Sequence, residues 1–282
     1  MQLRTLTPIA IIGLLLCILY YSVAANLIYD WQFNPDYSHG FFIPLIVGYM
    51  IYSRRQELKE AAVTPNNWGL VLFVLGITQF ILGTIGAEHF LQSTSMIVVV
   101  LGIVLFFSGI RTTRIIFVPI LYMLFMIPLP AIIWNDFAFT LRLFASDVAV
   151  ICMHALGMLV LQEGNMLYLP GASLEVVDAC SGMRSLVSLL ALGALFAFLS
   201  DHPVWKKWLV FLSAIPIAII SNIIRLIITV ALVQRYGSEM ASGFTHEVSG
   251  LLVFFIGLIL FFIVYKLLSI WPKYSIDKND TE

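Results

Sequence analysis

Long apolar runs separated by short polar stretches dominate the chain. Each run is close to the length of about 20 residues that crosses a hydrocarbon core of ~30 Å as a helix. The runs cover residues 8–29, 67–86, 91–110, 115–133, 180–200, 206–234 and 248–270. A shorter run at 39–53 is flanked by Tyr37, Tyr49 and Tyr52, which suit the membrane interfaces, so it counts as a further span. The pattern predicts an all-α integral membrane protein, a polytopic bundle of about eight transmembrane helices.

The stretch at 137–161 is apolar but contains Arg142 and Asp147, so it fits either a spanning helix or a helix along the membrane surface. The placement of Lys and Arg favours the second arrangement. If the N-terminus is inside and this stretch does not cross, eleven of the 15 basic residues share the inner side, as the positive-inside rule requires. These are Arg4, Arg54, Arg55, Lys59, Arg111, Arg114, Lys206, Lys207, Lys266, Lys273 and Lys278. We therefore predict cytoplasmic termini and an interfacial helix at 137–161.

Residues 164–178 contain two short extended pieces around a turn at Pro170 and Gly171. This segment predicts a small hairpin on the outer face that leads into Cys180. The chain contains no internal repeat, linker or low-complexity tract, so residues 1–282 are expected to form a single transmembrane domain. The first apolar run also has features of a signal peptide, but an uncleaved first span is the commoner use of such a run in a multispanning chain.

The composition excludes a soluble fold, because 61% of the residues are hydrophobic and only 11% are charged, against about 25% charged in ordinary soluble domains. The mean hydropathy is +0.99. The net charge of -1, without a long basic tract, excludes nucleic acid as an expected partner and leaves membrane lipid as the surrounding medium. Two of the three cysteines, Cys17 and Cys152, lie in apolar runs, so no disulfide framework is indicated.

The third cysteine, Cys180, stands where a helix is predicted to begin after Asp178, a suitable N-cap. A helix N-terminus favours anions and therefore favours the reactive thiolate. At helical spacing Cys180 shares one polar stripe with Ser181, Arg184, Ser185 and Ser188. A buried structural cysteine beside packing serines is the alternative, and Arg184 one turn on weighs against it.

Two further ionisable residues lie in or beside later apolar runs, where charge is costly and tends to serve function. Arg225, three residues after Asn222, falls only about 7 Å outward of the predicted bilayer midplane and needs an anionic or carbonyl partner. A structural ion pair with Glu175 or Asp178 is the alternative role. His246 precedes the last apolar run, on the side predicted for Cys180, although a single interfacial histidine can also be incidental.

Together Cys180, Arg225 and His246 provide a nucleophile, a charge stabiliser and a base, which are the parts that acyl transfer requires. The sequence contains no HExxH motif and no cluster of Cys and His ligands, so neither a metal nor an organic cofactor is expected.

Three segments that contain these residues resemble the exosortase and archaeosortase family of membrane transpeptidases. They are Ala179-Cys180-Ser181-Gly182-Met183-Arg184, Asn222-Ile223-Ile224-Arg225 and His246-Glu247-Val248-Ser249-Gly250. Residues 35–44, which include Tyr37-Ser38-His39-Gly40, are similar to the segment that opens the second span of bacterial exosortases. The archaeal branch often has arginine in place of His246, so the histidine favours the bacterial branch.

The resemblance implies that Cys180 is the nucleophile, Arg225 a partner of the thiolate or transition state, and His246 the proton-transfer residue. Arg184 and Asn222 are expected to bind substrate. The implied substrates are exported proteins that end in a Pro-Glu-Pro-like motif, a transmembrane helix and a basic tail. Cleavage is then expected through a thioester, without a cofactor, at the periplasmic face of the bacterial inner membrane.

The main alternative is a transporter or export-complex subunit in which Arg184 and Arg225 bind an anionic substrate. Such a protein should tolerate Cys180→Ser, whereas a cysteine transpeptidase should not. A membrane acyltransferase is less well supported because the chain has no HxxxxD motif. An interaction scaffold gives no reason for an arginine at membrane depth.

Overall fold

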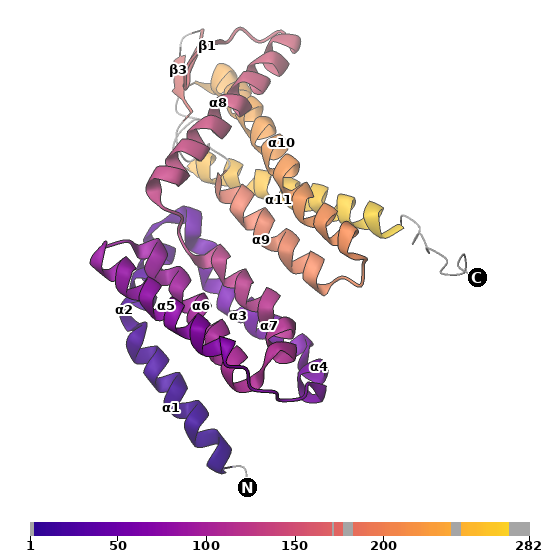
Figure 1. The fold of residues 1–282 in the computed structure, drawn as a ribbon. Helices are drawn as coiled ribbons and strands as arrows, with labels where there is room; N and C mark the ends of the chain where they lie inside the picture. The colour runs from indigo at the N-terminus through magenta and orange to yellow at the C-terminus, as the bar shows by residue number, and fades with distance from the viewer. Residues whose placement is uncertain (1–2, 171, 177–182, 238–243, 271–282) are drawn as a thin grey trace, which may run out of the picture. The chain divides into compact units, whose positions relative to one another are not determined.

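Helices make up most of the described chain in the computed structural model, which describes residues 3–170, 172–176, 183–237 and 244–270 (Figure 1). For residues 3–9, 142, 183–185 and 244–253 it describes the course of the backbone alone. The chain divides into two compact units, residues 1–134 and 135–282, and each is described by itself. The single transmembrane domain expected for residues 1–282 stays a prediction.

The first unit consists of helices of unequal length. In chain order these are α1 (Leu3–Leu19), α2 (Tyr21–Phe33), the 3-10 helix η1 (Pro35–Phe42), α3 (Ile43–Ser53), α4 (Arg55–Glu60), α5 (Trp68–Ile85), α6 (His89–Ser108), α7 (Ile110–Tyr122) and the 3-10 helix η2 (Met123–Met126). The two longest, α5 and α6, match the apolar runs predicted at 67–86 and 91–110 and lie side by side as an antiparallel pair (Figure 1).

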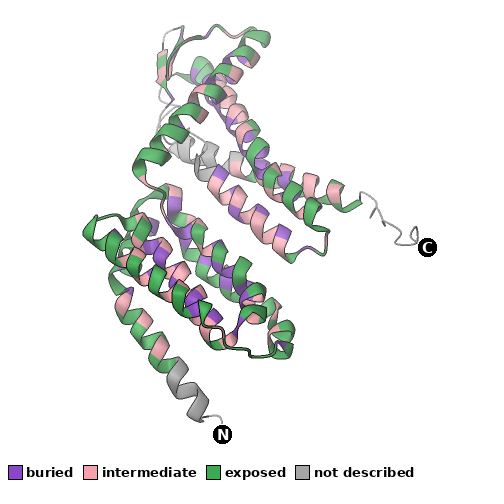
Figure 2. Cartoon of the chain, in the orientation of Figure 1, coloured by how far each residue is buried: buried purple, intermediate pink, exposed green. Residues whose placement is uncertain are grey.

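Glycines allow α5 and α6 to approach closely. Gly69, Gly76 and Gly83 recur every seventh residue of α5, so they share the face turned toward α6. A Cβ atom at Gly76 would lie 2.6 Å from a methyl carbon of Val99, and one at Gly69 would overlap the backbone of Phe106. Small residues at a helix interface give close van der Waals packing, which stabilises helix pairs in lipid. The outward faces of these helices are exposed and apolar, as contact with lipid requires (Figure 2).

The segment around η1 is attached to η2 and the residues after it. Three hydrogen bonds make this connection: Trp31 Nε1 donates to Met126 O (2.9 Å), His39 Nε2 donates to Phe125 O (3.0 Å) and Leu129 N donates to Tyr37 Oη (3.1 Å). A Cβ atom at Gly40 would overlap the Trp31 indole, so the glycine leaves the space that the indole occupies. The Tyr-Ser-His-Gly segment therefore has a structural role in the first unit.

The second unit contains four helices and a small sheet in its described part. Its elements are α8 (Ala131–Ala155, which begins at the end of the first unit), β1 (Leu161–Glu163), β2 (Met166–Leu169), β3 (Ala172–Glu175), α9 (Met183–Leu199), α10 (Val204–Tyr236) and α11 (Phe244–Ile270). The helices α9, α10 and α11 run in alternating directions along the chain, and α10 packs against both of the others (Figure 1).

The predicted hairpin is confirmed as β2 and β3, which pair antiparallel from Met166 opposite Glu175 to Leu169 opposite Ala172. The sequence analysis missed β1, which pairs with β2 through a two-residue turn at Gly164 and Asn165. The φ of Gly164 is +62°. The favoured two-residue hairpin turns, types I′ and II′, both require a positive φ at their first central residue, and glycine adopts it readily.

One face of the sheet packs against α8 and α10 and forms the core of this part of the second unit. The buried residues of this core are Ala149, Val150, Met153, Val160, Leu167, Leu169, Val176, Leu226, Val230 and Val233. The core therefore holds the sheet against the half of α10 that follows Arg225.

Four described helices, α5, α6, α8 and α10, are long and apolar enough to cross a membrane, or five spans if the bent pair α1–α2 counts as one. The described segments Leu186–Leu199 and Phe254–Ile270 are apolar but shorter. An all-α membrane protein is thus confirmed, whereas the number of eight spans stays a prediction. The helix expected at 137–161 corresponds to α8, which begins earlier, at Ala131, and ends at Ala155, whereas Leu161 begins β1. The interfacial placement of this helix stays a prediction.

Three expected spans have a different local structure. The run at 8–29 bends by 63° between α1 and α2 and is not one straight helix. The run at 39–53 is the end of η1 followed by α3, whose 11 residues extend about 17 Å. The run at 115–133 is divided among α7, η2 and the start of α8.

Candidate functional site

The helix α10 carries the polar residues of interest on its buried side. Its 33 residues extend about 50 Å, well beyond a hydrocarbon core. Buried positions recur every three or four residues, so they form one stripe along the helix (Figure 2). The stripe consists of Lys206, Val210, Ala214, Ile217, Ala218, Ser221, Asn222, Arg225, Leu226, Thr229, Val230 and Val233.

Asn222 and Arg225 are neighbours in this stripe, because side chains three residues apart in a helix lie on the same face. Asn222 is 4% exposed and Arg225 is 9% exposed, so both have left bulk water. Ser221 and Thr229, which are 0% and 8% exposed, lie one helical turn before and one turn after Arg225 and extend the polar part of the stripe. A buried guanidinium beside a buried amide provides several hydrogen-bond donors in a medium of low polarity.

Ser221 also marks the place where α9, α10 and α11 meet. A Cβ atom at Gly257 of α11 would lie 3.1 Å from Ser221 Oγ and 3.2 Å from Leu189 Cδ1 of α9. A methyl group at Gly257 would therefore require the side chains of Ser221 and Leu189 to shift by a few tenths of an ångström. We call this place the crossing point. The Oγ of Ser221 is buried and has no hydrogen-bond partner among the described residues.

The rise of 1.5 Å per residue gives the distance, along each helix axis, between a predicted site residue and the crossing point. Arg225 lies four residues beyond it along α10, or about 6 Å, and Arg184 lies five residues from it along α9, or about 8 Å. His246 lies eleven residues from it along α11, or about 17 Å. Because the three helices alternate in direction, all three displacements point to the same end of the unit.

The predicted site residues are described to different extents. Cys180, with its predicted cap Asp178, lies outside the described residues. The backbone of Arg184 lies in the first turn of α9, and the backbone of His246 lies in the first turn of α11. The prediction that the last helix follows His246 was wrong, because α11 begins at Phe244.

Glu175, one of the two carboxylates considered as a partner for Arg225, is exposed at the edge of the sheet. Its Oε1 accepts a hydrogen bond from Asn165 Nδ2 at 3.1 Å, across the β2–β3 pair. The carboxylate of Glu175 therefore helps to hold β3 next to the start of β2.

The opposite end of α10 is basic. Lys206 is 1% exposed, and its Nζ donates to the backbone oxygen of Leu268 near the end of α11, at 3.0 Å. A cation at a helix C-terminus is favourable because the terminal carbonyls carry partial negative charge. Lys206, Lys207 and Lys266 thus share one end of the three helices, and Arg184 and His246 lie toward the other. Arg225 and Arg235 also lie toward that other end, so both ends carry basic residues and the orientation in the membrane stays a prediction.

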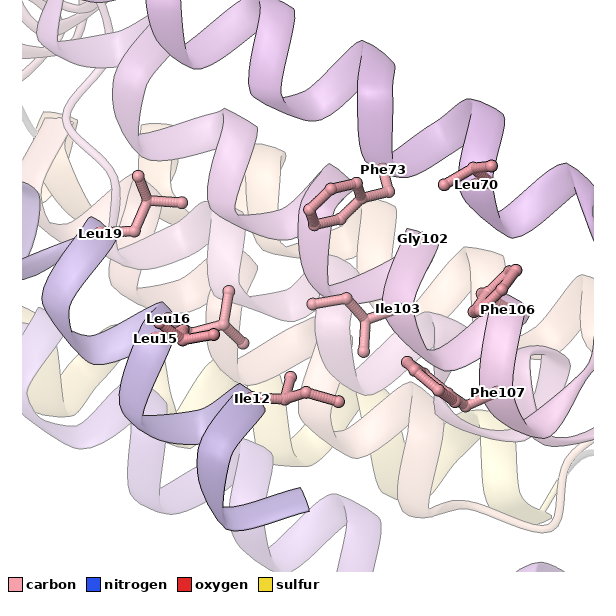
Figure 3. Close-up of a pocket in the computed structure, with 10 residues that line it drawn as sticks. All are labelled: Ile12, Leu15, Leu16, Leu19, Leu70, Phe73, Gly102, Ile103, Phe106 and Phe107. Carbon is pink, nitrogen blue, oxygen red and sulfur yellow. The ribbon is translucent and has the colours of Figure 1, made fainter. Parts of the chain in front are cut away.

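An apolar cavity of about 280 Å³ lies in the first unit, between α1, α5 and α6 (Figure 3). Leu16, Phe73 and Ile103 are among its lining residues, and the side chains that line it are all hydrocarbon. Such a cavity offers no group for acid–base or nucleophilic chemistry, so the candidate site remains at the end of α9, α10 and α11 that contains Arg225.

The comparison with protein families matches residues 31–263 to the transmembrane exosortases. The chain belongs to the transmembrane exosortase family. The match begins at Trp31, before the Tyr-Ser-His-Gly segment, and continues past His246, so it includes all the predicted site residues of this exosortase. No curated protein and no solved structure matches the chain.

One residue near the candidate site, Gly257, was missed by the sequence analysis. Gly257 lies in an apolar run in which a single glycine has no distinguishing pattern, and only the contact with Ser221 and Leu189 reveals its role.

Proposed function

We propose that this exosortase is a membrane-embedded cysteine peptidase and transpeptidase that cleaves the C-terminal sorting signal of exported proteins. The family match over residues 31–263, which includes Cys180, Arg225 and His246, is the observation that carries the proposal. The buried pair of Asn222 and Arg225 supports it, because a polar cluster of this kind is costly in a membrane helix and needs a functional reason.

In the proposed first step, the thiolate of Cys180 attacks a peptide carbonyl of the sorting signal. A bond forms between sulfur and carbon, and the carbonyl oxygen becomes an oxyanion. Arg225 stabilises this charge, since donors that are fixed in a site of low polarity interact with a developing oxyanion far more strongly than water does. The 9% exposure of Arg225 meets the requirement for such a medium.

His246 handles the protons in this scheme. When the carbon–nitrogen bond breaks, His246 protonates the leaving amine, and the thioester remains on Cys180. His246 then removes a proton from the acceptor, an amine or water, which attacks the thioester and restores the thiolate. His246 lies about 10 Å further from the crossing point than Arg225, so the site would have a deep charged part and a proton-transferring part nearer the membrane surface.

Asn222 and Arg184 are assigned to substrate binding. Asn222 lies one turn from Arg225 and can donate to or accept from a peptide group that enters beside the guanidinium. Arg184 lies at nearly the same level on α9, so the two arginines would face the peptide from two helices.

The substrates implied for this exosortase are exported proteins that end in a Pro-Glu-Pro-like motif, a transmembrane helix and a basic tail. The predicted placement of eleven of the 15 basic residues on one side supports an orientation in which the substrate's basic tail stays in the cytoplasm and its motif reaches the outer ends of the helices. The reaction would then take place at the periplasmic face of a bacterial inner membrane.

The test is cleavage of an exported reporter that ends in such a signal, in cells that also produce the full-length exosortase. Cys180→Ala should abolish cleavage, and Cys17→Ala combined with Cys152→Ala should not, since Cys17 is exposed on an apolar helix and Cys152 lies on α8. If Cys180→Ala protein at normal levels still shortens the reporter, the transpeptidase proposal fails and the transporter alternative becomes the better one.

A further inference from the structure

The small sheet of the second unit has one edge held by other elements and one edge, the outer side of β3, that no described backbone group pairs with; we call it the open edge. At the β1 edge, Gln162 Nε2 donates to Asp147 Oδ1 of α8 at 2.8 Å, and His154 Nε2 of α8 donates to Val160 O at 2.7 Å. At the other edge of the order β1-β2-β3, no backbone hydrogen bond among the described residues crosses the outer side of β3.

The register determines which groups that open edge presents. Val176 N donates to Asn165 O at 2.8 Å, so this pair is hydrogen-bonded. Hydrogen-bonded and non-hydrogen-bonded pairs alternate in an antiparallel ladder. Ser173 and Glu175 therefore occupy non-hydrogen-bonded positions, and their N–H and C=O groups point away from β2. Both residues are exposed.

The outward N–H and C=O groups of Ser173 and Glu175 are the groups with which an extended peptide can form backbone hydrogen bonds. Their donors and acceptors repeat every second residue, about 6.8 Å apart, which is the spacing in any extended strand. The edge also lies close to the proposed nucleophile in the chain, because Cys180 follows Glu175 by five residues, a reach of about 18 Å at most.

We propose that the peptide to be cleaved binds by strand addition to the open edge of β3, with every second residue bonded to Ser173 or Glu175. This inference rests on the proposed function and specifies how its substrate is held. Main-chain pairing holds a peptide in the extended form that exposes its carbonyls to a nucleophile, and it does so with little demand on side chains.

A second copy of this chain is a poorer occupant of the same edge. Antiparallel pairing of two β3 strands would bring the charged Glu175 side chains onto one small sheet, and a short, charged edge strand opposes such self-pairing. A Pro-Glu-Pro-like motif can avoid this pairing, because its prolines, which have no N–H, can take the positions that point away from β3 while its glutamate pairs with Ser173.

Proline substitution tests the edge directly. Ser173→Pro and Glu175→Pro each remove one outward donor and leave the β2 ladder donors in place. In membranes that contain the full-length protein, each should lower kcat/KM for the exported reporter about three- to tenfold, the effect of one backbone hydrogen bond. Gln162→Pro, the control, removes the outward donor of the opposite edge together with the side-chain hydrogen bond to Asp147, and it should leave kcat/KM per folded molecule unchanged. Equal rates in all these proteins would overturn strand addition.

Cross-linking gives a second result that does not depend on activity. Ser173→Cys is placed in a protein with Cys17→Ala, Cys152→Ala and Cys180→Ala, and single cysteines are scanned along the reporter before its transmembrane helix. Strand addition predicts disulfides at every second reporter position. Links without this periodicity, or links only between two copies of the exosortase, would overturn it.

The two proposals fail in different ways. If Cys180→Ala abolishes cleavage and the proline variants cleave normally, strand addition alone is wrong. If Cys180→Ala protein still cleaves the reporter, the proposed function itself is wrong, whatever the proline variants do.

Discussion

The helix pair α5–α6 and the three helices α9, α10 and α11 pack in different ways, because only the second group buries an arginine. In α5 and α6, glycines such as Gly69 and Gly76 bring the two backbones together. Hydrogen bonds of uncharged side chains join the same two helices: Gln79 Nε2 donates to Thr94 Oγ1 at 2.7 Å, and Gln92 Nε2 donates to Gly83 O at 3.2 Å. Along α10, the buried stripe instead contains Ser221, Asn222 and Arg225. Lipid is as apolar as the helix surface, so the hydrophobic effect does not drive helices together in a membrane. Close van der Waals packing can stabilise a helix pair without it.

The difference indicates which helices serve structure and which serve chemistry. A buried arginine costs free energy that a glycine contact does not, and a fold would not retain it for packing. The polar stripe of α10 is thus the part of the described chain that calls for a functional explanation, and the glycine contacts of α5 and α6 are the part that does not.

The largest effect in this comparison is expected from Arg225→Lys. Lysine keeps the charge but cannot reproduce the planar fork of the guanidinium, so cleavage of the reporter should fall at least about a hundredfold. Arg235→Lys is the matched control, because Arg235 is exposed in the last turn of the same helix. Initial cleavage rates at equal protein levels give the measurement. Equal rates in both variants would leave Arg225 with a structural role.

Gly69→Ala should affect stability and not chemistry. The added Cβ overlaps the backbone of Phe106, so α5 and α6 must separate, with a loss of about 1–3 kcal/mol in the free energy of unfolding. Gly48→Ala on α3 meets nothing within 4 Å and should be neutral or slightly stabilising. Denaturation in detergent micelles measures both. If Gly69→Ala lowered the cleavage rate per folded molecule, the division between structural and chemical helices would be incorrect.

Arg184→Lys should have the smallest effect, a loss of less than about tenfold in cleavage rate. Arg184 lies in the first turn of α9, whereas eleven residues of α10 follow Arg225, so a lysine at position 184 can reach the same charged region from a helix end. The same reporter assay compares the two arginines. A loss as large as that of Arg225→Lys would assign Arg184 an equal part in stabilising the oxyanion.

The sequence predicted some helices closely because a particular residue type, glycine, marks where they end. The run at 67–86 ends at Gly86, and the run at 91–110 ends beside Gly109, whose φ of +85° breaks the helix. The bend near Tyr20 could not be predicted, since no proline or glycine marks it and the residues on both sides remain apolar.

The same contrast applies to the sheet and the site. The strands β2 and β3 have a proline–glycine turn signal between them, whereas the three residues of β1 show no alternation and only Gly164-Asn165 indicates a turn. The three-residue spacing of Asn222 and Arg225 is by itself sufficient to put them on one face of a helix. The crossing point at Gly257 depends on tertiary packing of three helices, which the order of residues does not encode locally.

The central claim, that Cys180 forms a thioester with the substrate, is most directly tested by mass spectrometry of the full-length protein after a brief incubation with the reporter. We expect an adduct with the mass of the shortened reporter, on the peptide that contains Cys180, released by hydroxylamine as a thioester should be. An adduct on any other residue, or a shortened reporter produced without Cys180, would contradict the account.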